Sequence, residues 1–128
     1  ESQPTVLPGT QEQIQEAVKA WLATRGLEIE KESENELLTK RVNTLSKGDD
    51  AIGKYAKLPR NFMPVWFGSY RILFTFEPAE GGISVGMSCL FMAINANHGK
   101  RMWEIAPSKG VLEEEFWNHM REATKDFQ

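Results

Sequence analysis

The chain has few of the residues that most catalytic and metal sites need, with one cysteine and two histidines among 128 residues. A single cysteine cannot form a disulfide within the chain, and Cys89 falls on the apolar positions of a predicted strand, where we expect a small core side chain. His98 and His119 have no cysteine or carboxylate partner at metal-ligand spacing, so we expect no zinc and no other cofactor. Glycine-rich phosphate-binding loops are also absent. The sequence therefore favours a protein that is not an enzyme.

Long hydrophobic runs and a strong net charge are lacking as well. No run approaches the roughly 18 consecutive apolar residues of a membrane-spanning helix. The formal charge of -3 gives no general attraction to nucleic acid, and we expect no nucleic-acid partner. A composition of 41% hydrophobic and 26% charged residues is typical of a globular protein. We predict one domain over residues 10–128, preceded by a flexible N-terminal tether over the polar, proline-bearing residues 1–9.

The longest alternation of apolar and polar residues lies between positions 70 and 92. Two alternating runs are joined by the segment from Pro78 to Gly82, which predicts a β-hairpin with one apolar face. Its apolar positions are Tyr70, Ile72, Phe74 and Phe76 in the first arm and Ile83, Val85, Met87, Cys89 and Phe91 in the second. This face has to be covered by other elements, and two helical patterns are available.

The first helical pattern begins at Thr10, whose hydroxyl forms a capping box with Gln13, and ends at Arg25 before Gly26. The second follows Gly110, with glutamates at 113–115 where the helix dipole favours negative charge. Both carry apolar stripes at helical spacing. The stripes are Ile14, Ala17, Val18, Trp21 and Leu22 in the first helix, and Leu112, Phe116, His119 or Met120, Ala123 and Phe127 in the second.

Shorter strands are predicted over residues 27–30, 37–42 and 101–105, where apolar side chains alternate or cluster between turn residues. Leu37 and Leu38 are adjacent, so only one of them can face the core. The predicted fold class is α+β, an antiparallel sheet in the order α-β-β-loop-β-β-β-α with the N- and C-terminal helices packed on one face.

Residues 43–66 interrupt the pattern with glycines and prolines and form a connection longer than compact domains normally use. Between Lys40 and Arg71 the chain holds seven basic and two acidic residues, interleaved with aromatic ones. Such a loop can contact an anionic headgroup, a glycan or an acidic protein, or its aromatic side chains can pack beneath it while its charges are solvated. The partner-binding candidates are Tyr55, Lys57, Arg60, Phe62 and Trp66.

A second interpretation places a small apolar ligand or lipid between helix and sheet. The cavity would be lined by Phe74, Phe76, Met87 and Phe91. The same side chains can instead form a solid core, and the sequence is compatible with both.

Three phrases of the sequence resemble those of a known family. They are Trp21 to Ile29, a helix end with an "LxxxG" phrase before a strand; Tyr70 to Val85, a "YRLTVTxEPxxGGTxV"-like hairpin; and Trp103 with Ser108 to Phe116, an "SxGxLExxF"-like helix start. Together they resemble small bacterial envelope lipoproteins whose soluble domain is similar to the helix-grip-type modules of the outer-membrane assembly lipoprotein BamC. The resemblance spans most of the chain from Thr10 to Phe127 and excludes the 43–66 loop.

This resemblance implies a periplasmic or outer-membrane-anchored domain, tethered through a lipid upstream of residue 1. It implies a non-catalytic accessory or assembly factor that acts through contacts with an envelope protein. The groove between helix and sheet, or an unpaired sheet edge, would then be the docking surface.

Overall fold

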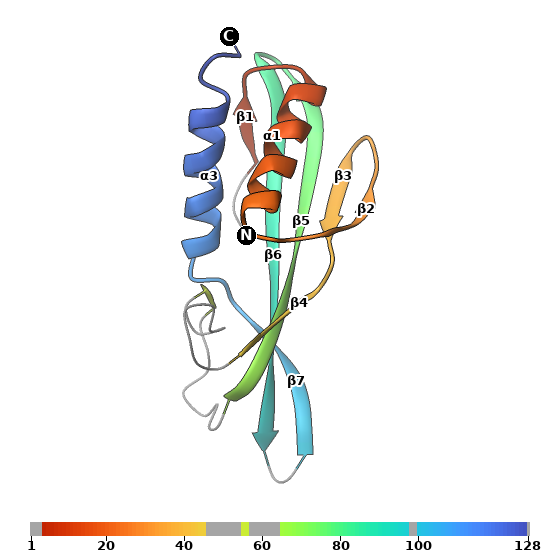
Figure 1. Ribbon diagram of the computed structural model, residues 1–128, viewed down its shortest axis with the longest axis vertical. Helices are drawn as coiled ribbons and strands as arrows, with labels where there is room; N and C mark the ends of the chain where they lie inside the picture. Colours follow the sequence, from red (N-terminus) through yellow and green to blue (C-terminus); the bar gives the residue numbers. More distant parts are fainter. Residues whose placement is uncertain (1–3, 46–54, 57–64, 98–99, 128) are drawn as a thin grey trace. The chain divides into compact units, whose positions relative to one another are not determined.

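The computed structural model describes residues 4–45, 55–56, 65–97 and 100–127, with side chains left out at 44–45, 65–67, 93–97 and 100–104. These residues form an α+β fold with an antiparallel open sheet and two helices, which confirms the α+β class and the antiparallel sheet of the prediction. The sheet order is β1 (Thr5–Leu7), β6 (Gly82–Asn97), β5 (Val65–Ala79), β3 (Glu36–Thr39) and β2 (Ile29–Glu32) (Figure 1). In addition, β4 (Val42–Leu45) is paired to β5, and β7 (Lys100–Ala106) is paired to β6. The order of elements differs from the predicted one, because strand β1 precedes the first helix and a separate β4 follows β3.

The chain groups into two compact units. Unit 1 comprises residues 1–40, 72–88 and 113–128, and unit 2 comprises residues 41–71 and 89–112. Strands β5 (Val65–Ala79) and β6 (Gly82–Asn97) contribute residues to both. The expectation of a single domain over residues 10–128 stays a prediction.

Helix α1 (Gln11–Thr24) begins and ends where the sequence predicts. Thr10 is the N-cap: its hydroxyl accepts a hydrogen bond from the Gln13 amide at 3.2 Å, while the Gln13 side chain accepts one from the Thr10 amide at 3.0 Å. Gly26 follows the helix at φ +70°, a conformation that L side chains rarely adopt. All five predicted stripe residues are buried.

The hairpin of β5 and β6 is confirmed, but its turn is shorter than predicted. Pro78 and Ala79 belong to β5, and only Glu80 and Gly81 separate the strands. The amide of Phe76 donates to the carbonyl of Asn35, next to strand β3 (Glu36–Thr39). Pro78 is the next residue of β5 whose backbone nitrogen is directed to the β3 side, and it lies beyond the first residue of β3. Its missing N–H therefore removes no hydrogen bond to that strand.

Strand β1 (Thr5–Leu7) lies within residues 1–9, for which the sequence predicts a flexible tether, and it places residues 5–7 in the sheet. It pairs antiparallel with β6, with Leu7 opposite Ile83 and Thr5 opposite Val85. Leu7 is buried. A three-residue strand between prolines has no local alternation to reveal it, because its stability comes from a pairing partner almost 80 positions along the chain.

The strand predicted over residues 37–42 is two strands. β3 pairs with β2 (Ile29–Glu32) and with β5, whereas β4 (Val42–Leu45) pairs with β5. The break falls at Lys40, whose amide donates to the carbonyl of Glu28 at 2.8 Å and so follows β2. Leu37 takes the core position and Leu38 is half-buried, which settles the ambiguity of that pair.

The core of unit 1 is aromatic where α1, β5 and helix α3 (Val111–Ala123) meet. The ring centroid of Trp21 lies 6.5 Å from that of Phe74 and 5.1 Å from that of Phe116, and the rings of Phe74 and Phe116 are 4.9 Å apart. Arg25 lies 5.4 Å from the Trp21 ring and pairs with Glu115 at 2.7 Å. The sequence allows either His119 or Met120 in the apolar stripe of α3. Met120 is the buried one of the two and takes this position.

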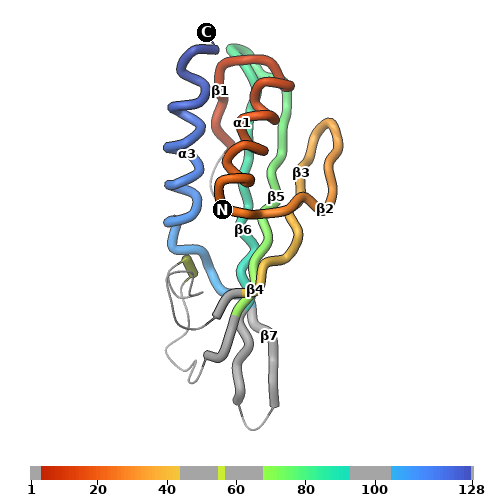
Figure 2. The backbone as a smooth tube through the Cα atoms, in the orientation of Figure 1, coloured from red at the N-terminus to blue at the C-terminus, as the bar shows by residue number. Residues whose placement is uncertain are grey.

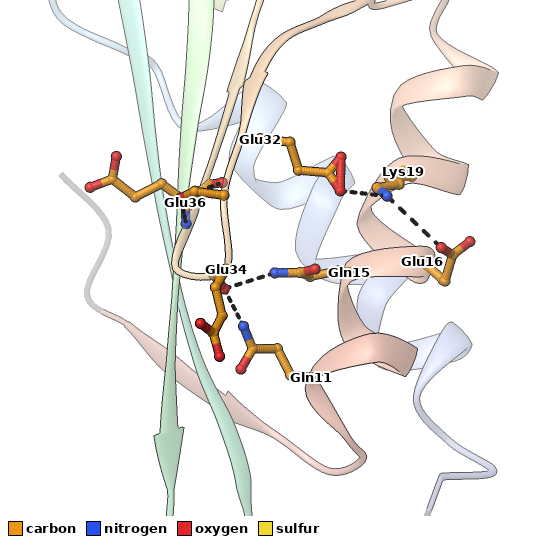
Figure 3. A network of polar contacts seen from close by, with 8 residues as sticks. Gln11, Gln15, Glu16, Lys19, Glu32, Glu34 and Glu36 are labelled. Atoms are coloured by element: carbon orange, nitrogen blue, oxygen red, sulfur yellow. Dashed lines mark hydrogen bonds and ion pairs between the residues drawn. The ribbon is translucent and has the colours of Figure 1, made fainter.

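The turn between β2 and β3 is held against α1 by polar side chains (Figure 3). The carbonyl of Glu34 accepts hydrogen bonds from Gln11 Nε2 and from Gln15 Nε2, the latter at 3.0 Å. Lys19 pairs with Glu32 at 2.6 Å. The backbone trace shows this hairpin beside β5 (Figure 2), where it adds the two strands at that edge of the sheet.

Candidate functional site

Unit 2 contains the most exposed large apolar side chain in the described part of the chain. Ile105, on strand β7 (Lys100–Ala106), is 82% exposed, and Leu90 on β6 is 48% exposed. The third large hydrophobic exposed there is Val6 of unit 1, at 47%. The environment of Ile105 and Leu90 is therefore the best candidate for a functional surface.

The sheet register brings these side chains onto one face. β7 runs antiparallel to β6, with Ile105 opposite Met92 and Ala106 opposite Phe91 (Figure 1). Directly opposite residues share a face, and residues two apart along a strand do too. Leu90, Met92 and Ile105 therefore form one surface, called here the outer face of unit 2.

The opposite face of the same strands is the core of unit 2. Tyr70 lies between Tyr55 and Phe91, with ring centroids 6.3 Å and 5.6 Å away respectively. Phe91 and Ala106 are 1% and 4% exposed, next to the much more exposed Leu90 and Ile105. Exposed and buried residues alternate at these positions of both strands, so the register is intact. The outer face of unit 2 is apolar because Leu90, Met92 and Ile105 occupy it.

Two of the site residues predicted from the sequence have described backbones in this unit. Tyr55 is 2% exposed, and its carbonyl accepts a hydrogen bond from the Lys109 amide at 2.9 Å. Its neighbour Ala56 forms a β-bridge with Ser108. Tyr55 therefore packs as the core alternative required and presents no surface to a partner. The backbone of Trp66 lies in β5, and its side chain is outside the described residues, as are Lys57, Arg60 and Phe62 altogether.

The four residues of the predicted ligand cavity are all buried. Phe74, Phe76 and Met87 belong to unit 1 and Phe91 to unit 2, with exposures of at most 2%. Phe74 is surrounded by the rings of Trp21 and Phe116, and Phe91 contacts Tyr70. These ring contacts favour solid packing at the two positions over a ligand.

Cys89 departs from the expected pattern. Its position on the apolar parity of β6 predicts a core side chain, yet it is half-buried. It is the first residue of unit 2 on β6, and here the strand leaves the tightly packed stretch from Ile83 to Met87.

Sequence reasoning did not select the outer face of unit 2. The available signal was Leu90, an apolar residue on the parity that Ser84 and Ser88 otherwise occupy in β6. Ile105 was included in a predicted strand without an assigned face, since only its pairing with Met92 determines which way it points.

Charge separates the two units. By sequence, unit 2 holds nine basic and three acidic residues, a net charge of +6, in a chain whose total is -3. The basic excess found between Lys40 and Arg71 continues with Lys100, Arg101 and Lys109. The outer face of unit 2 thus belongs to a unit that attracts anionic surfaces.

Within the described residues, no group of three or more His, Cys, Asp or Glu side chains is placed to hold a metal ion, and no helix is both long and apolar enough to cross a membrane. Comparison with protein-family models, with curated proteins and with solved structures finds no match to this chain.

Proposed function

We propose that this protein is a non-catalytic protein-interaction module that binds an acidic protein through the outer face of unit 2. The observation that carries the proposal is the exposure of Ile105, at 82%, beside Leu90 on one face of a sheet. A single exposed aliphatic residue is ordinary, but neighbouring ones on paired strands offer a surface that a partner can dehydrate. The charge of +6 on the unit supports an acidic partner.

The residues at the end of the β6–β7 hairpin favour a protein as the partner of this surface, in preference to a lipid bilayer. By sequence, His98 and Gly99 join β6 to β7, between Asn97 and Lys100, and these residues offer no apolar tip for insertion among lipid chains. The apolar residues lie instead on the strand face, near the opposite end of the pairing. Lys57, Arg60, Phe62 and Trp66 remain predicted contacts that would extend this surface.

Two finer statements belong to the same proposal. We expect α1 and α3 to pack on one face of the sheet, which the contacts of Trp21 with both Phe74 and Phe116 support. We also expect an envelope location, anchored through a lipid upstream of residue 1, on the basis of the resemblance to envelope lipoproteins. Fractionation of the native cells and the intact mass of the membrane-fraction species test that location.

The interaction is tested with a matched pair of substitutions at Ile105. Ile105→Thr keeps β-branching and strand propensity but replaces a methyl-bearing arm with a hydroxyl, whereas Ile105→Val keeps an apolar surface. In native cells, a crosslinker placed at Leu90 should capture a protein with an acidic surface from the unsubstituted chain and from Ile105→Val. The captured fraction should fall by about tenfold in Ile105→Thr, since a lost buried apolar contact is worth roughly 1–2 kcal/mol.

Thermal unfolding serves as the control for correct folding. The melting temperature should change little in either variant, because Ile105 is exposed. Equal capture by Ile105→Thr and Ile105→Val, with both proteins folded, would show that the outer face of unit 2 does not carry the interaction. Capture of lipid alone would replace the protein partner with a membrane surface.

A further inference from the structure

The acidic surface that unit 2 requires is present on the chain itself. By sequence, unit 1 holds fifteen acidic and six basic residues, a net charge of -9. Its described ion pairs already engage four of the six basic residues, including Lys40 with Glu28 at 3.2 Å and Arg25 with Glu115 at 2.7 Å. Ion pairs within the unit leave this net charge of -9 unchanged.

Many of these carboxylates lie on the surface. Glu36, Glu77, Glu80 and Glu114 are exposed, and they belong to β3, β5, the hairpin turn and α3. The acidity of unit 1 is therefore spread over strand, turn and helix surfaces and is not one local cluster. A body of this charge repels any anionic surface within about a Debye length, roughly 10 Å at 0.1 M salt.

This repulsion discriminates among occupants of the outer face of unit 2. An anionic bilayer would attract unit 2 and repel unit 1 of the same chain. A second copy presents its own acidic unit 1 to the basic unit 2, so every contact between unlike units is attractive. Charge complementarity within one sequence thus favours a second copy.

We propose that copies of this chain associate head to tail, with unit 2 of one copy bound to unit 1 of the next. The inference rests on the proposed function, because it names the acidic partner of the outer face of unit 2. The interface is heterologous: the two contacting surfaces differ, so each bound copy still offers one free unit of each charge. Association then continues into longer assemblies unless the rotation between copies closes a ring.

Two charge-reversed variants test the assignment. Arg41→Glu with Lys109→Glu reduces the net charge of unit 2 from +6 to +2, and Glu36→Lys with Glu77→Lys changes that of unit 1 from -9 to -5. All four side chains are exposed, so we expect both variants to fold. In sedimentation velocity at about 0.01 M salt, the unsubstituted chain should form assemblies that grow with concentration. They should dissociate at about 1 M salt, where the Debye length falls to roughly 3 Å.

Each variant alone should associate at least about tenfold more weakly. Their mixture is the decisive sample, because one variant retains an intact acidic unit 1 and the other an intact basic unit 2. Head-to-tail association predicts a discrete one-to-one complex that does not grow further. As a control, Lys31→Glu with Glu77→Lys exchanges two exposed charges within unit 1 without changing its net charge, and should assemble like the unsubstituted chain.

A chain that stays monomeric at low salt over the whole concentration range, or a mixture that forms no complex, would overturn the assignment. Variants whose circular dichroism shows unfolding are replaced by Arg41→Gln with Lys109→Gln. A monomer that still crosslinks to another acidic protein through Leu90 would refute self-assembly while the proposed interaction stands. A monomer that instead cosediments with anionic vesicles, and captures no protein, would refute both.

Discussion

Thr39 supplies a side-chain hydrogen bond at the place where β3 separates from β5. The N–H groups of alternate β5 residues face β3: Phe76 donates to the carbonyl of Asn35, and Ile72, four residues earlier, faces the end of the same strand. There the amide of Ile72 donates to the Thr39 hydroxyl at 2.9 Å. Both residues are 0% exposed, so no water can replace the acceptor. We predict that Thr39→Val destabilises unit 1.

The magnitude follows from the loss of the acceptor without a change of shape. Valine fills nearly the volume of threonine, so packing is preserved while the Ile72 amide is left buried without its hydroxyl partner. A buried donor left in this way costs about 1–3 kcal/mol. With a urea dependence of about 2 kcal/mol per molar for a domain of this size, the unfolding midpoint should fall by roughly 0.5–1.5 M. Thr39→Ser keeps the hydroxyl and loses only a methyl group, which costs about 1 kcal/mol.

Urea unfolding and amide hydrogen exchange together check the reasoning. Because the two substitutions have overlapping energies, the exchange rate of the Ile72 amide decides between them. In Thr39→Ser it should rise only by about the fivefold that a loss of about 1 kcal/mol in global stability accounts for, whereas in Thr39→Val it should rise by more than the loss of global stability accounts for. If Thr39→Val unfolds at the original urea concentration and the Ile72 amide keeps its protection, the hydroxyl is not the acceptor that matters.

Two further predictions concern the edges of unit 1. Gly82 has φ +150°, and a Cβ there would lie against the carbonyl oxygen of Leu7, whereas Gly81 has φ +91° and a Cβ there would meet nothing within 4 Å. Gly82→Ala should therefore lower the free energy of unfolding by more than Gly81→Ala, which adds only about 1–2 kcal/mol of backbone strain. Gly82→Ala should also expose the β1 amides to hydrogen exchange. Equal costs would contradict the close approach. A hydrogen bond and ion pair from Glu32 raise the pKa of Lys19 above 10.5, which favours the charged lysine in the folded state. Lys19→Met should thus lose about 0.2–1 kcal/mol at pH 7, and the difference should disappear as the pH rises through the raised pKa; a difference that persists in strong alkali would exclude the ion pair as its cause.

Local signals were sufficient for the elements whose determinants are adjacent in the chain. Helix α1 was predicted to its ends because the Thr10 cap, the apolar stripe and Gly26 all lie within 17 residues. The sequence predicts the β5–β6 hairpin because alternating residues lie on both sides of the turn signal of Gly81 and Gly82. In both elements, the structure that the local residues favour is the one found in the folded chain.

Non-local pairing explains what the sequence could not show. β1 exists because Thr5–Leu7 meet β6, and the split between β3 and β4 exists because Lys40 hydrogen-bonds to Glu28. Neither contact leaves a periodic trace in the residues that make it. The turn was overestimated for a related reason: Pro78 reads as a turn residue until the length of the neighbouring strand β3 is known.

The candidate site was predicted only in its charge. The basic excess of the segment around the loop was visible in the sequence, and it continues through all of unit 2. Tyr55 was chosen because aromatic side chains interleaved with basic ones suit a partner, but the same aromatic character suits a core, and its ring packs with Tyr70. Exposure is a property of the assembled sheet, so it could not be assigned from residue type.

Along strand β6, the residues on the parity opposite the core change from small or polar in unit 1 to large and apolar in unit 2. On the parity opposite its core side chains, unit 1 has Ser84, Gly86 and Ser88, of which Gly86 is buried, whereas unit 2 has Leu90 and Met92. The change falls at the boundary between the units, and Ile105 of β7 is matched to the apolar half by its register. Because exposed residues contribute little to folding, this change is free to serve binding. Replacing Leu90 with serine would extend the unit 1 pattern by one position, and we expect it to weaken association while leaving thermal stability within about 0.5 kcal/mol of the original.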